Sequence, residues 1–387
     1  MKVTIIVGGR FHAFDLAEQL HKSKFLKQLI TSYPKYYINK NFNIESKFIK
    51  SFFSKEILHR SLKKISLFDH YFDIDLITSN LFDNKASKII DFKNTDIIVG
   101  WSSFSLKSFE IASKYDCTKI LERGSSHIEY QRDILKEEND LIGADCKLPS
   151  SKIIDKEKKE YDLSDYICVP SEFSKKSFLK KGFSEKKIIK IPYGVDLNNF
   201  FLPNKTKDNS QFNIICVGAI SVRKGSIYLL KAFNELNLKN SKLIFIGDIE
   251  KGFKKILNMH LNRNVEVIKS VSQNSLRNFY NQASIFVTCP VEDGFGMVIL
   301  QAMACGLPVI ATNNAGGSEI IDDGIDGYII PTRDKEKLKE KLLFLYQNKK
   351  ELLLMGKKAE HKAKNFFSWK NYGEKIKNFY LSVIKGK

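Results

Sequence analysis

Short apolar runs rich in β-branched residues alternate along this chain with longer stretches whose apolar positions follow a helical period. That alternation is typical of parallel α/β layers. Helical patterns occur at 12–22, 104–114 and 296–305. The strands expected between the helical stretches are 2–7, 26–32, 95–100, 118–122, 165–169 and 188–192 in the first half, and 212–217, 242–247, 265–269, 284–289 and 308–312 in the second.

The pattern lapses once, over "IPYGVDLNNFFLPNKTKDNS" at 191–210, which we interpret as a linker. A length of 387 residues also favours two domains. We therefore predict two facing α/β domains with parallel sheets and an interdomain cleft. The first domain is expected at 1–195 and the second at 205–367, followed by a C-terminal helix at about 368–387 that could pack back on the first.

Residues 33–67 depart from this pattern, because they mix aromatic residues with lysines and include an amphipathic helix candidate at 48–65. Such a helix could rest on a membrane or hold an acceptor. The alternative, which the sequence favours slightly, is a surface helix that packs its apolar face inward.

The chain carries 63 Lys and Arg against 44 Asp and Glu, a formal net charge of +19. A basic surface favours anionic lipid, nucleic acid or phosphorylated substrates. General enrichment in Lys, Ile, Asn and Phe explains the charge equally well. Arginine is scarce, with only eight residues, so an arginine in a glycine-containing turn suggests a phosphate or carboxylate partner. Arg10, Arg123 and Arg223 occupy such turns.

The six cysteines show no C-x-x-C or other metal spacing, so we expect neither a disulfide framework nor a metal site. No apolar run approaches the roughly 20 residues of a membrane span, and the N-terminal run is too short for a signal peptide. We expect a cytoplasmic protein, or one that is peripheral on the inner side of a membrane.

Candidate chemistry follows the predicted strands, because open α/β sheets bind ligands at the carboxyl ends of their strands. Gly8-Gly9 follows the first strand and precedes a helix whose N–H groups could face an anion. Arg223 and Lys224 precede another predicted helix. Two cations at a helix start oppose the helix dipole, so a bound anion would explain them; the alternative is a solvated basic turn.

The stretch "EDGFGMVILQ" combines a carboxylate, a glycine turn and a helix start. The N–H groups of Phe295, Gly296 and Met297 are expected to point at a ligand above the turn. Asp293 stands before them, and Gln301 lies roughly 8 Å further along the helix. That spacing would reach from a sugar, past a pyrophosphate, to a ribose. A solvent-facing helix residue is the alternative interpretation of Gln301.

In the first half, "ERGSSH" follows the strand at 118–122 and ends at His127. A histidine at a helix start is often a structural hydrogen-bond partner. Its position at a strand end facing the proposed cleft makes a catalytic role an equal alternative.

These motifs resemble those of the retaining family 4 glycosyltransferases. The resemblance is carried by "EDGFGMVILQAMACGLPVIAT", by GG-S-E-I-I-x-x-G-x-x-G at 316–327, by "IPYGVDLNNF" and by "VGAISVRKG". It implies the GT-B fold, with a nucleotide-sugar donor held mainly by the second domain and a glycan, lipid-linked or small-molecule acceptor held mainly by the first. It also implies transfer with retention of anomeric configuration, without a metal or other cofactor.

The resemblance also implies roles for particular residues. Arg223 and Lys224 would bind the diphosphate, and the 294–297 turn would hold the donor sugar and phosphate. The catalytic candidates are His127, Asp293, Arg223 and Lys224; the donor-binding candidates are Gly8, Gly9, Arg223, Lys224, Gly294, Phe295, Gly296, Met297 and Gln301; and the acceptor-side candidates are Arg10 and Arg123.

Two positions depart from the family pattern. The family's paired glutamates appear here as Asp293 and Gln301, which puts donor affinity or nucleotide choice in question. Ala219 stands where an arginine often follows the strand-end glycine, and we infer that Arg223 supplies that charge.

Two alternatives remain at this stage. One is another GT-B enzyme, a sugar-nucleotide epimerase or a phosphorylase. The other is a non-catalytic basic module on a membrane surface or nucleic acid, but no nucleic-acid motif supports a nucleic-acid partner.

Overall fold

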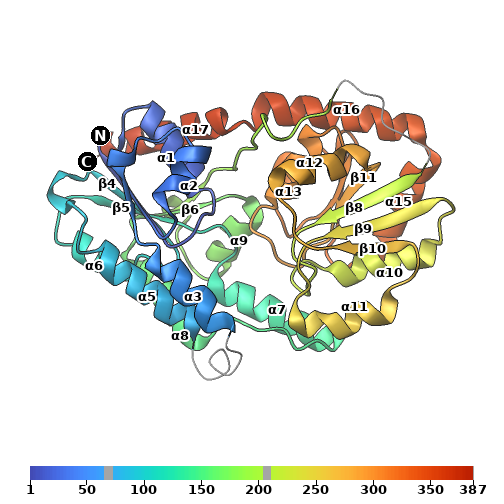
Figure 1. Cartoon of the computed structure of the whole chain (residues 1–387), viewed down its shortest axis with the longest axis horizontal. Helices are drawn as coiled ribbons and strands as arrows, with labels where there is room; N and C mark the ends of the chain where they lie inside the picture. The colour runs from blue at the N-terminus through green and yellow to red at the C-terminus, as the bar shows by residue number, and fades with distance from the viewer. Residues whose placement is uncertain (65–72, 204–210, 387) are drawn as a thin grey trace.

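A computed structural model describes residues 1–64, 73–203 and 211–386. Within these residues the strands form two sheets. Figure 1 shows the sheets side by side, with helices around each. Within the described residues, neighbouring strands of both sheets pair in parallel. The expected pair of α/β domains with parallel sheets is therefore confirmed, and each domain is Rossmann-like.

The first sheet has the order β3-β2-β1-β4-β5-β6-β7 within the described residues. Its central strand, Val3–Val7, is buried at every position, because helices cover both faces of the sheet. The strands are β1 Val3–Val7, β2 Leu26–Thr31, β3 Ile49–Ser51, β4 Ile97–Trp101, β5 Thr118–Glu122, β6 Tyr166–Val169 and β7 Ile188–Lys190. The helices are α1 Ala13–Lys22, α2 Lys35–Asn41, α3 Ser54–Lys64, α5 Ile74–Ala86, α6 Leu106–Ala112, α7 Ile128–Ile142, α8 Ser151–Leu163 and α9 Glu172–Lys180.

The second sheet repeats this arrangement, with the order β10-β9-β8-β11-β12-β13. Its strands are β8 Phe212–Val217, β9 Ser241–Ile246, β10 Val265–Ile268, β11 Ile285–Thr288, β12 Val309–Thr312 and β13 Gly327–Ile330. The helices are α10 Ser226–Leu236, α11 Lys254–His260, α12 Gln273–Gln282, α13 Met297–Ala304, α14 Gly317–Ile320, α15 Lys335–Gln347, α16 Lys349–Phe366 and α17 Trp369–Lys385. In both sheets successive strands are first added on one side of the first strand, β1 or β8, and then on its other side. Folds of this type bind ligands at this switch in strand order.

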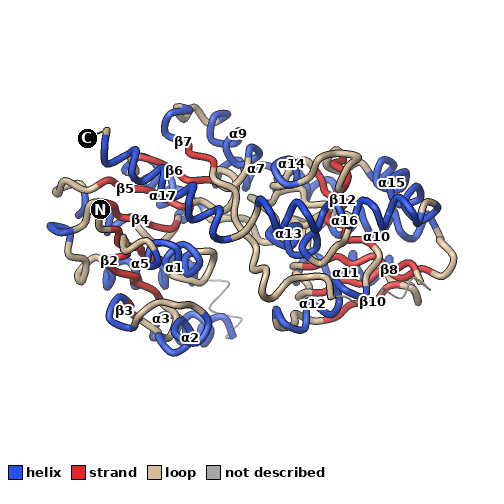
Figure 2. The backbone as a smooth tube through the Cα atoms, turned by 90° about the horizontal axis from the view of Figure 1, so that it is seen from above, coloured by secondary structure: helices blue, strands red, loops and turns tan. Residues whose placement is uncertain are grey.

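The chain passes from one domain to the other twice, and the two connecting segments run side by side where the domains meet. Val195 N–H donates to Phe367 O at 2.8 Å, next to an isolated parallel bridge between Val195 and Ser368. A Cβ at Gly194 would lie 2.6 Å from the Trp369 backbone nitrogen, so only glycine allows this approach. Beyond the crossing α17 packs on α1 of the first domain, while α16 packs on α13 of the second (Figure 2).

Two of the edge strands were not predicted from the sequence, and the bounds predicted for one helix are partly wrong. Ile49–Ser51 forms β3 rather than the start of a helix at 48–65, because Ile49 pairs with Leu29 of β2. The helix in this segment, α3, begins at Ser54, and residue 65 lies outside the described residues. The other unpredicted strand, Gly327–Ile330, pairs with β12. The boundary expected between 195 and 205 reaches residues that are not described, so it stays a prediction.

Two further expectations concern disulfides and membrane-spanning helices. All six cysteines are buried, and none of them is in a disulfide. Among the described helices, none combines the length and the apolar character that a membrane crossing requires.

Candidate functional site

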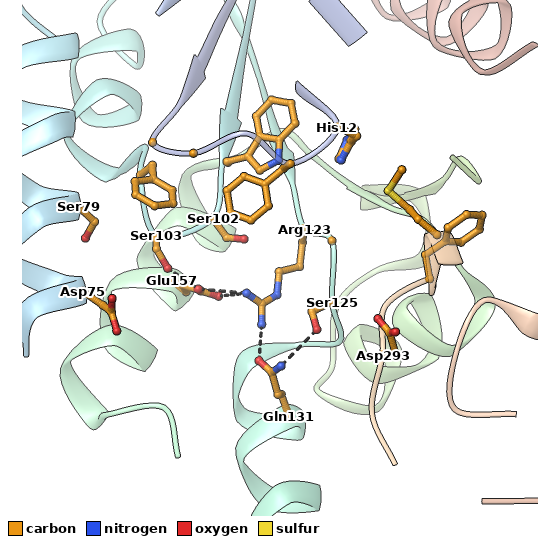
Figure 3. Close-up of a pocket in the computed structure, with 18 of the residues that line it drawn as sticks. His12, Asp75, Ser79, Ser102, Ser103, Arg123, Ser125, Gln131, Glu157 and Asp293 are labelled. Atoms are coloured by element: carbon orange, nitrogen blue, oxygen red, sulfur yellow. Dashed lines mark hydrogen bonds and ion pairs between the residues drawn. The ribbon is translucent and has the colours of Figure 1, made fainter. Parts of the chain in front are cut away.

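A cavity of about 730 Å³ lies between the carboxyl ends of the two sheets. Figure 3 shows the polar side chains that converge on it from both domains. Of the sequence candidates, those that line it are Gly8, Gly9, Arg123, Arg223, Lys224, Asp293, Phe295, Gly296 and Met297. The structure therefore brings together most of the residues selected from the sequence, from loops after four different strands.

The glycine loop after β1 contributes the first wall. A Cβ at Gly8 would lie 2.0 Å from Cδ1 of Phe104, so glycine is required here to make room for that ring. Lys55 Nζ donates to the Gly8 carbonyl at 2.7 Å. The loop is thus held between an aromatic ring and an ammonium group, both of which also line the cavity.

Arg223 enters the cavity from the second domain, which agrees with its expected place. Its Nε donates to Glu292 Oε2 at 2.6 Å, and its NH2 group donates to Ser125 Oγ at 3.2 Å. Burial opposes the guanidinium charge, but Glu292 and Asp293 outweigh that effect and raise the pKa of Arg223 above its ordinary value. Arg223 therefore stays positively charged, and some of its N–H groups already donate to protein groups.

Glu292 is fully buried and joins the two domains. Its Oε1 accepts hydrogen bonds from Ser125 Oγ at 2.7 Å and from Ser126 N at 3.0 Å, and its Oε2 accepts from Gln131 Nε2 at 2.9 Å. Burial disfavours the carboxylate, but Arg223 and these donors more than offset it, so the pKa of Glu292 lies well below its usual range. The first residue of the family-like motif thus binds side chains and backbone of both domains across the cleft.

Lys224 is the second cation of the site, and its ammonium pairs with Asp293. Asp293 is buried, and its backbone N–H donates to Asn314 O at 3.0 Å. Gly225 caps α10 in the left-handed region, and a Cβ there would lie 1.9 Å from the Cys289 carbonyl. The structure thereby fixes both cations at the start of α10, directly beside the loop that follows β11.

The turn at 294–297 opens α13, whose first N–H groups have no partner within the helix. Gly296 is left-handed, with φ +73. Gly294 does not line the cavity; it meets the first domain instead, where an added Cβ would lie 1.9 Å from the Gly124 carbonyl. The turn therefore offers Phe295, Gly296 and Met297 to the cavity while Gly294 permits the domains to close.

Gln301 is buried and does not line the cavity. Its Oε1 accepts a hydrogen bond from the buried Tyr280 hydroxyl at 3.3 Å. The solvent-facing alternative is wrong, and contact with a ribose would require a change in this pairing.

The two acceptor-side arginines lie in different environments. Arg123 lines the cavity but is buried, and it donates to Ser126 O at 2.9 Å, to Glu157 at 2.8 Å and to Gln131 Oε1 at 3.0 Å. Arg10 does not line the cavity; its guanidinium carbon lies 5.8 Å from the centre of the Tyr37 ring.

His127 does not face the cleft, contrary to the sequence expectation. It is buried among Tyr161, Phe178 and Phe183, with ring centroids 5.1, 5.1 and 5.6 Å away. Its Nδ1 accepts from Glu129 N at 3.2 Å and so caps α7. Burial lowers the pKa of His127 to about 4. The side chain points inward because capping and ring packing hold it there.

Sequence reasoning missed another histidine, His12, which does line the cavity. Its Nε2 lies 3.1 Å from Oε2 of the buried Glu122, and its ring centroid lies 4.0 Å from that of Tyr193. The sequence did indicate that His12 could lie near a ligand, since it follows shortly after the glycine loop. Its carboxylate partner is 110 positions away, and only the sheet brings the two together.

The comparison with protein families concerns the second domain. Residues 199–362 match the family described as glycosyl transferases group 1. Arg223, Lys224, the 294–297 turn and the start of α13 all lie within the matched residues.

Curated relatives cover part of the chain. An uncharacterized glycosyltransferase of Methanocaldococcus jannaschii is 32% identical over 167 residues, which are 42% of this chain and 46% of that protein. The capsular polysaccharide biosynthesis glycosyltransferase CapM of Staphylococcus aureus is 28% identical over 57% of this chain and 62% of its own length. The matched region thus spans between about half and two thirds of these relatives.

Solved structures match the whole chain. The sucrose-phosphate synthase of Thermosynechococcus elongatus superposes with a TM-score of 0.70 at 15% identity and covers 100% of both chains. HepE of Anabaena, solved in complex with UDP, gives a TM-score of 0.68 at 16% identity and covers 99% of this chain and 100% of its own. At such identities the likeness establishes the fold, and the chain has the GT-B fold.

Proposed function

We propose that this chain is a retaining glycosyltransferase that moves a sugar from a nucleotide-sugar donor to an acceptor held mainly by the first domain. The observation that carries this proposal is the meeting of Arg223, Lys224 and the start of α13 on one cavity wall, within the residues that match the group 1 family. Two cations and unpaired helix N–H groups suit a diphosphate. HepE, a structure with the same fold, was solved with UDP.

In the proposed reaction the bond between the anomeric carbon and the donor phosphate oxygen breaks. A bond forms between that carbon and an acceptor hydroxyl oxygen on the same face, and the hydroxyl proton passes to the departing phosphate. Arg223 and Lys224 stabilise the negative charge that develops on the leaving diphosphate. The N–H groups of the 295–297 turn and the carboxylate of Asp293 orient the donor sugar. These groups supply the charge stabilisation, so we propose a reaction without a metal or other cofactor.

Binding of nucleoside diphosphates tests the donor assignment. Thermal unfolding of the full chain is followed with UDP, GDP or ADP, and with their sugar conjugates. A ligand at one hundred times its Kd stabilises the folded state by about 2.7 kcal/mol. We expect one base to give a clear rise in melting temperature. No rise with any of them would sink the assignment.

Two variants test the residues. Lys224→Met and Arg223→Gln should lose the stabilisation by that nucleotide. The control, Lys337→Met, removes a half-exposed lysine of α15 and should keep it. The NMR signal of the anomeric proton in the first product formed then distinguishes retention from inversion.

We also propose a peripheral membrane contact through α3 and the residue before it. Phe53, Ile57 and Leu58 are exposed large apolar side chains on this segment. Exposed apolar groups on a basic chain suit an anionic bilayer surface. Sedimentation with vesicles of phosphatidylglycerol should carry the protein down, and Ile57→Ser with Leu58→Ser should leave it in the supernatant. Sedimentation unchanged by these substitutions would remove α3 from the contact.

A further inference from the structure

We propose that the first-domain part of the cavity binds an uncharged sugar ring, so that the acceptor presents a sugar hydroxyl rather than a phosphorylated headgroup. This inference rests on the proposed function and narrows its acceptor. The part in question, called the acceptor half below, is lined by Phe11, Lys55, Glu56, His59, Asp75, Ser79, Ser103, Phe104, Arg123 and Glu157.

The charges of the acceptor half are the first argument. Its described side chains include two permanent cations, Lys55 and Arg123, against three carboxylates, Glu56, Asp75 and Glu157. The chain as a whole has a net charge of +19. In so basic a protein, a site for a phosphorylated acceptor would be expected to hold excess positive charge.

Both cations of the acceptor half are also engaged by protein groups. Lys55 Nζ lies 3.0 Å from Glu56 Oε1 and donates to the Gly8 carbonyl. Arg123 lies 2.8 Å from Glu157 and is buried. Arg223 and Lys224 are paired as well, but they stand beside the start of α13, and the Arg223 side chain is 34% exposed whereas Arg123 is buried. A phosphate in the acceptor half would have to displace the carboxylates or lie beside them, whereas an uncharged ring would not.

The second argument is an exposed aromatic side chain held in a strained conformation. Phe11 lies in the left-handed region, with φ 42, where residues other than Gly, Asn and Asp are uncommon. The residue is 57% exposed and lines the cavity, and its ring lies 6.4 Å from the Phe104 ring. Strain of this kind persists where surrounding structure enforces it, often at ligand sites. The apolar C–H face of a sugar ring can cover such an aromatic surface and remove it from water.

The third argument is an exposed carboxylate, which lies across the cavity from the residues that we assign to the nucleotide sugar. Asp75 on α5 is 49% exposed, and its Oδ1 lies 2.8 Å from His59 Nε2. Figure 3 shows Asp75 and Ser79 on one side of the cavity and Asp293 on the other. A carboxylate accepts hydrogen bonds from the several hydroxyls of a sugar, and it repels a phosphate. Together the aromatic face and the carboxylate fit a neutral, hydroxyl-rich ring.

Saturation-transfer NMR on the full chain tests this inference. The probes are methyl glycosides of glucose, galactose, mannose and N-acetylglucosamine, set against glycerol 3-phosphate and inositol 1-phosphate, all with the stabilising nucleoside diphosphate present. We expect signal from at least one glycoside, strongest at its ring C–H protons, and none from the phosphates. Binding of the phosphates alone, or of no probe, would overturn the inference.

Variants at Phe11 locate the contact. Phe11→Asn removes the ring but suits a left-handed residue, and it should weaken glycoside binding roughly two- to tenfold. Phe11→Tyr keeps the ring and should restore it. Phe366→Asn, at an equally exposed aromatic residue that does not line the cavity, is the control. Unchanged binding in Phe11→Asn contradicts the assignment of the aromatic face.

Two further readouts separate the possible failures. If a nucleoside diphosphate stabilises the protein but no glycoside binds, the donor assignment stands and the acceptor inference fails. If no nucleotide binds, the proposed function itself fails. Among sugars that bind, transfer to a methyl glycoside indicates a free glycan acceptor. Transfer only to the same sugar on a prenyl diphosphate indicates a lipid-linked one.

Discussion

Arg223 of the second domain donates through Nε to Glu292 Oε2 at 2.6 Å, and the same carboxylate accepts from Ser126 of the first domain. The cation that we assign to the donor diphosphate is therefore coupled to contact between the domains. A ligand that draws Arg223 away from Glu292 would weaken this contact, so donor binding and domain closure depend on each other.

The first prediction concerns Glu292→Gln. The uncharged amide leaves the half-buried Arg223 without its main carboxylate, and the charge of the fully buried Glu292 is costly to remove from the pair. We expect the free energy of unfolding to fall by about 3 kcal/mol, measured by urea unfolding. Glu340→Gln, at a half-exposed residue of α15, is the control and should change it little. Equal stability of the two variants would show that the interdomain network is not structurally important.

The second prediction concerns Asp15 on α1, which lies in a separate cavity beside Asp196 and α17. The pKa of Asp15 is raised to about 7, mainly by burial; Arg10 lowers it in part, and Glu18 and Asp196 raise it. The folded state therefore holds this proton more tightly, and stability is lost as the pH rises from 3.8 to about 7.

Asp15→Asn should remove that loss. We expect its melting temperature at pH 8 to exceed that of the native chain by about 2–4 °C, with the difference vanishing near pH 4. Asp140→Asn, at an exposed aspartate of α7, serves as the control. A gain that is independent of pH would rule out titration of Asp15 as its source.

The third prediction concerns His127. Burial lowers the pKa of His127 from 6.5 to about 4, so the unfolded state binds a proton more readily and stability falls as the pH drops through that interval. Asn offers a side-chain oxygen to cap α7 in place of Nδ1 but cannot titrate. The His127→Asn variant should be less stable at pH 7 through lost ring packing, and the deficit should shrink towards pH 4.

Nucleotide binding separates this structural role from a catalytic one. The Kd of His127→Asn for the stabilising nucleoside diphosphate, and its transfer rate at a temperature where it is folded, should match those of the native chain. His361→Asn, at an exposed residue of α16, controls for the general effect of losing a histidine. A large loss of transfer rate with intact folding would return His127 to the catalytic candidates.

The fourth prediction concerns Gln301→Glu, which restores the acid that the family pattern has at this position. The buried side chain meets the Tyr280 hydroxyl, and a carboxylate there loses hydration for one hydrogen bond. Without ligand the melting temperature should fall by about 2–6 °C, whereas Gln347→Glu on the exposed face of α15 should have little effect. Unchanged ligand-free stability combined with tighter nucleotide binding would instead place residue 301 against the ribose.

Local pattern was sufficient for most of the fold. Central parallel strands are buried on both faces, so each appears as a continuous apolar run, such as Val3–Val7, that can be recognised without its neighbours. Of the four described edge strands, β3 and β13 were missed, because they are recognised by their pairing with β2 and β12 rather than by an apolar run of their own. The glycine turns and the paired cations were also recognisable, since left-handed or crowded backbone positions and clustered charge are local properties.

The sequence by itself determined two successive parallel α/β units and the loops that carry Gly8, Arg223, Lys224 and Asp293 to a common cavity. Only the tertiary structure decided where side chains point. It turned His127 and Gln301 inward, paired His12 with a carboxylate 110 positions away, and placed Glu292 against the opposite domain. The physical reason is that burial and hydrogen-bond partners come from distant segments, and no spacing along the chain encodes the direction from which they approach.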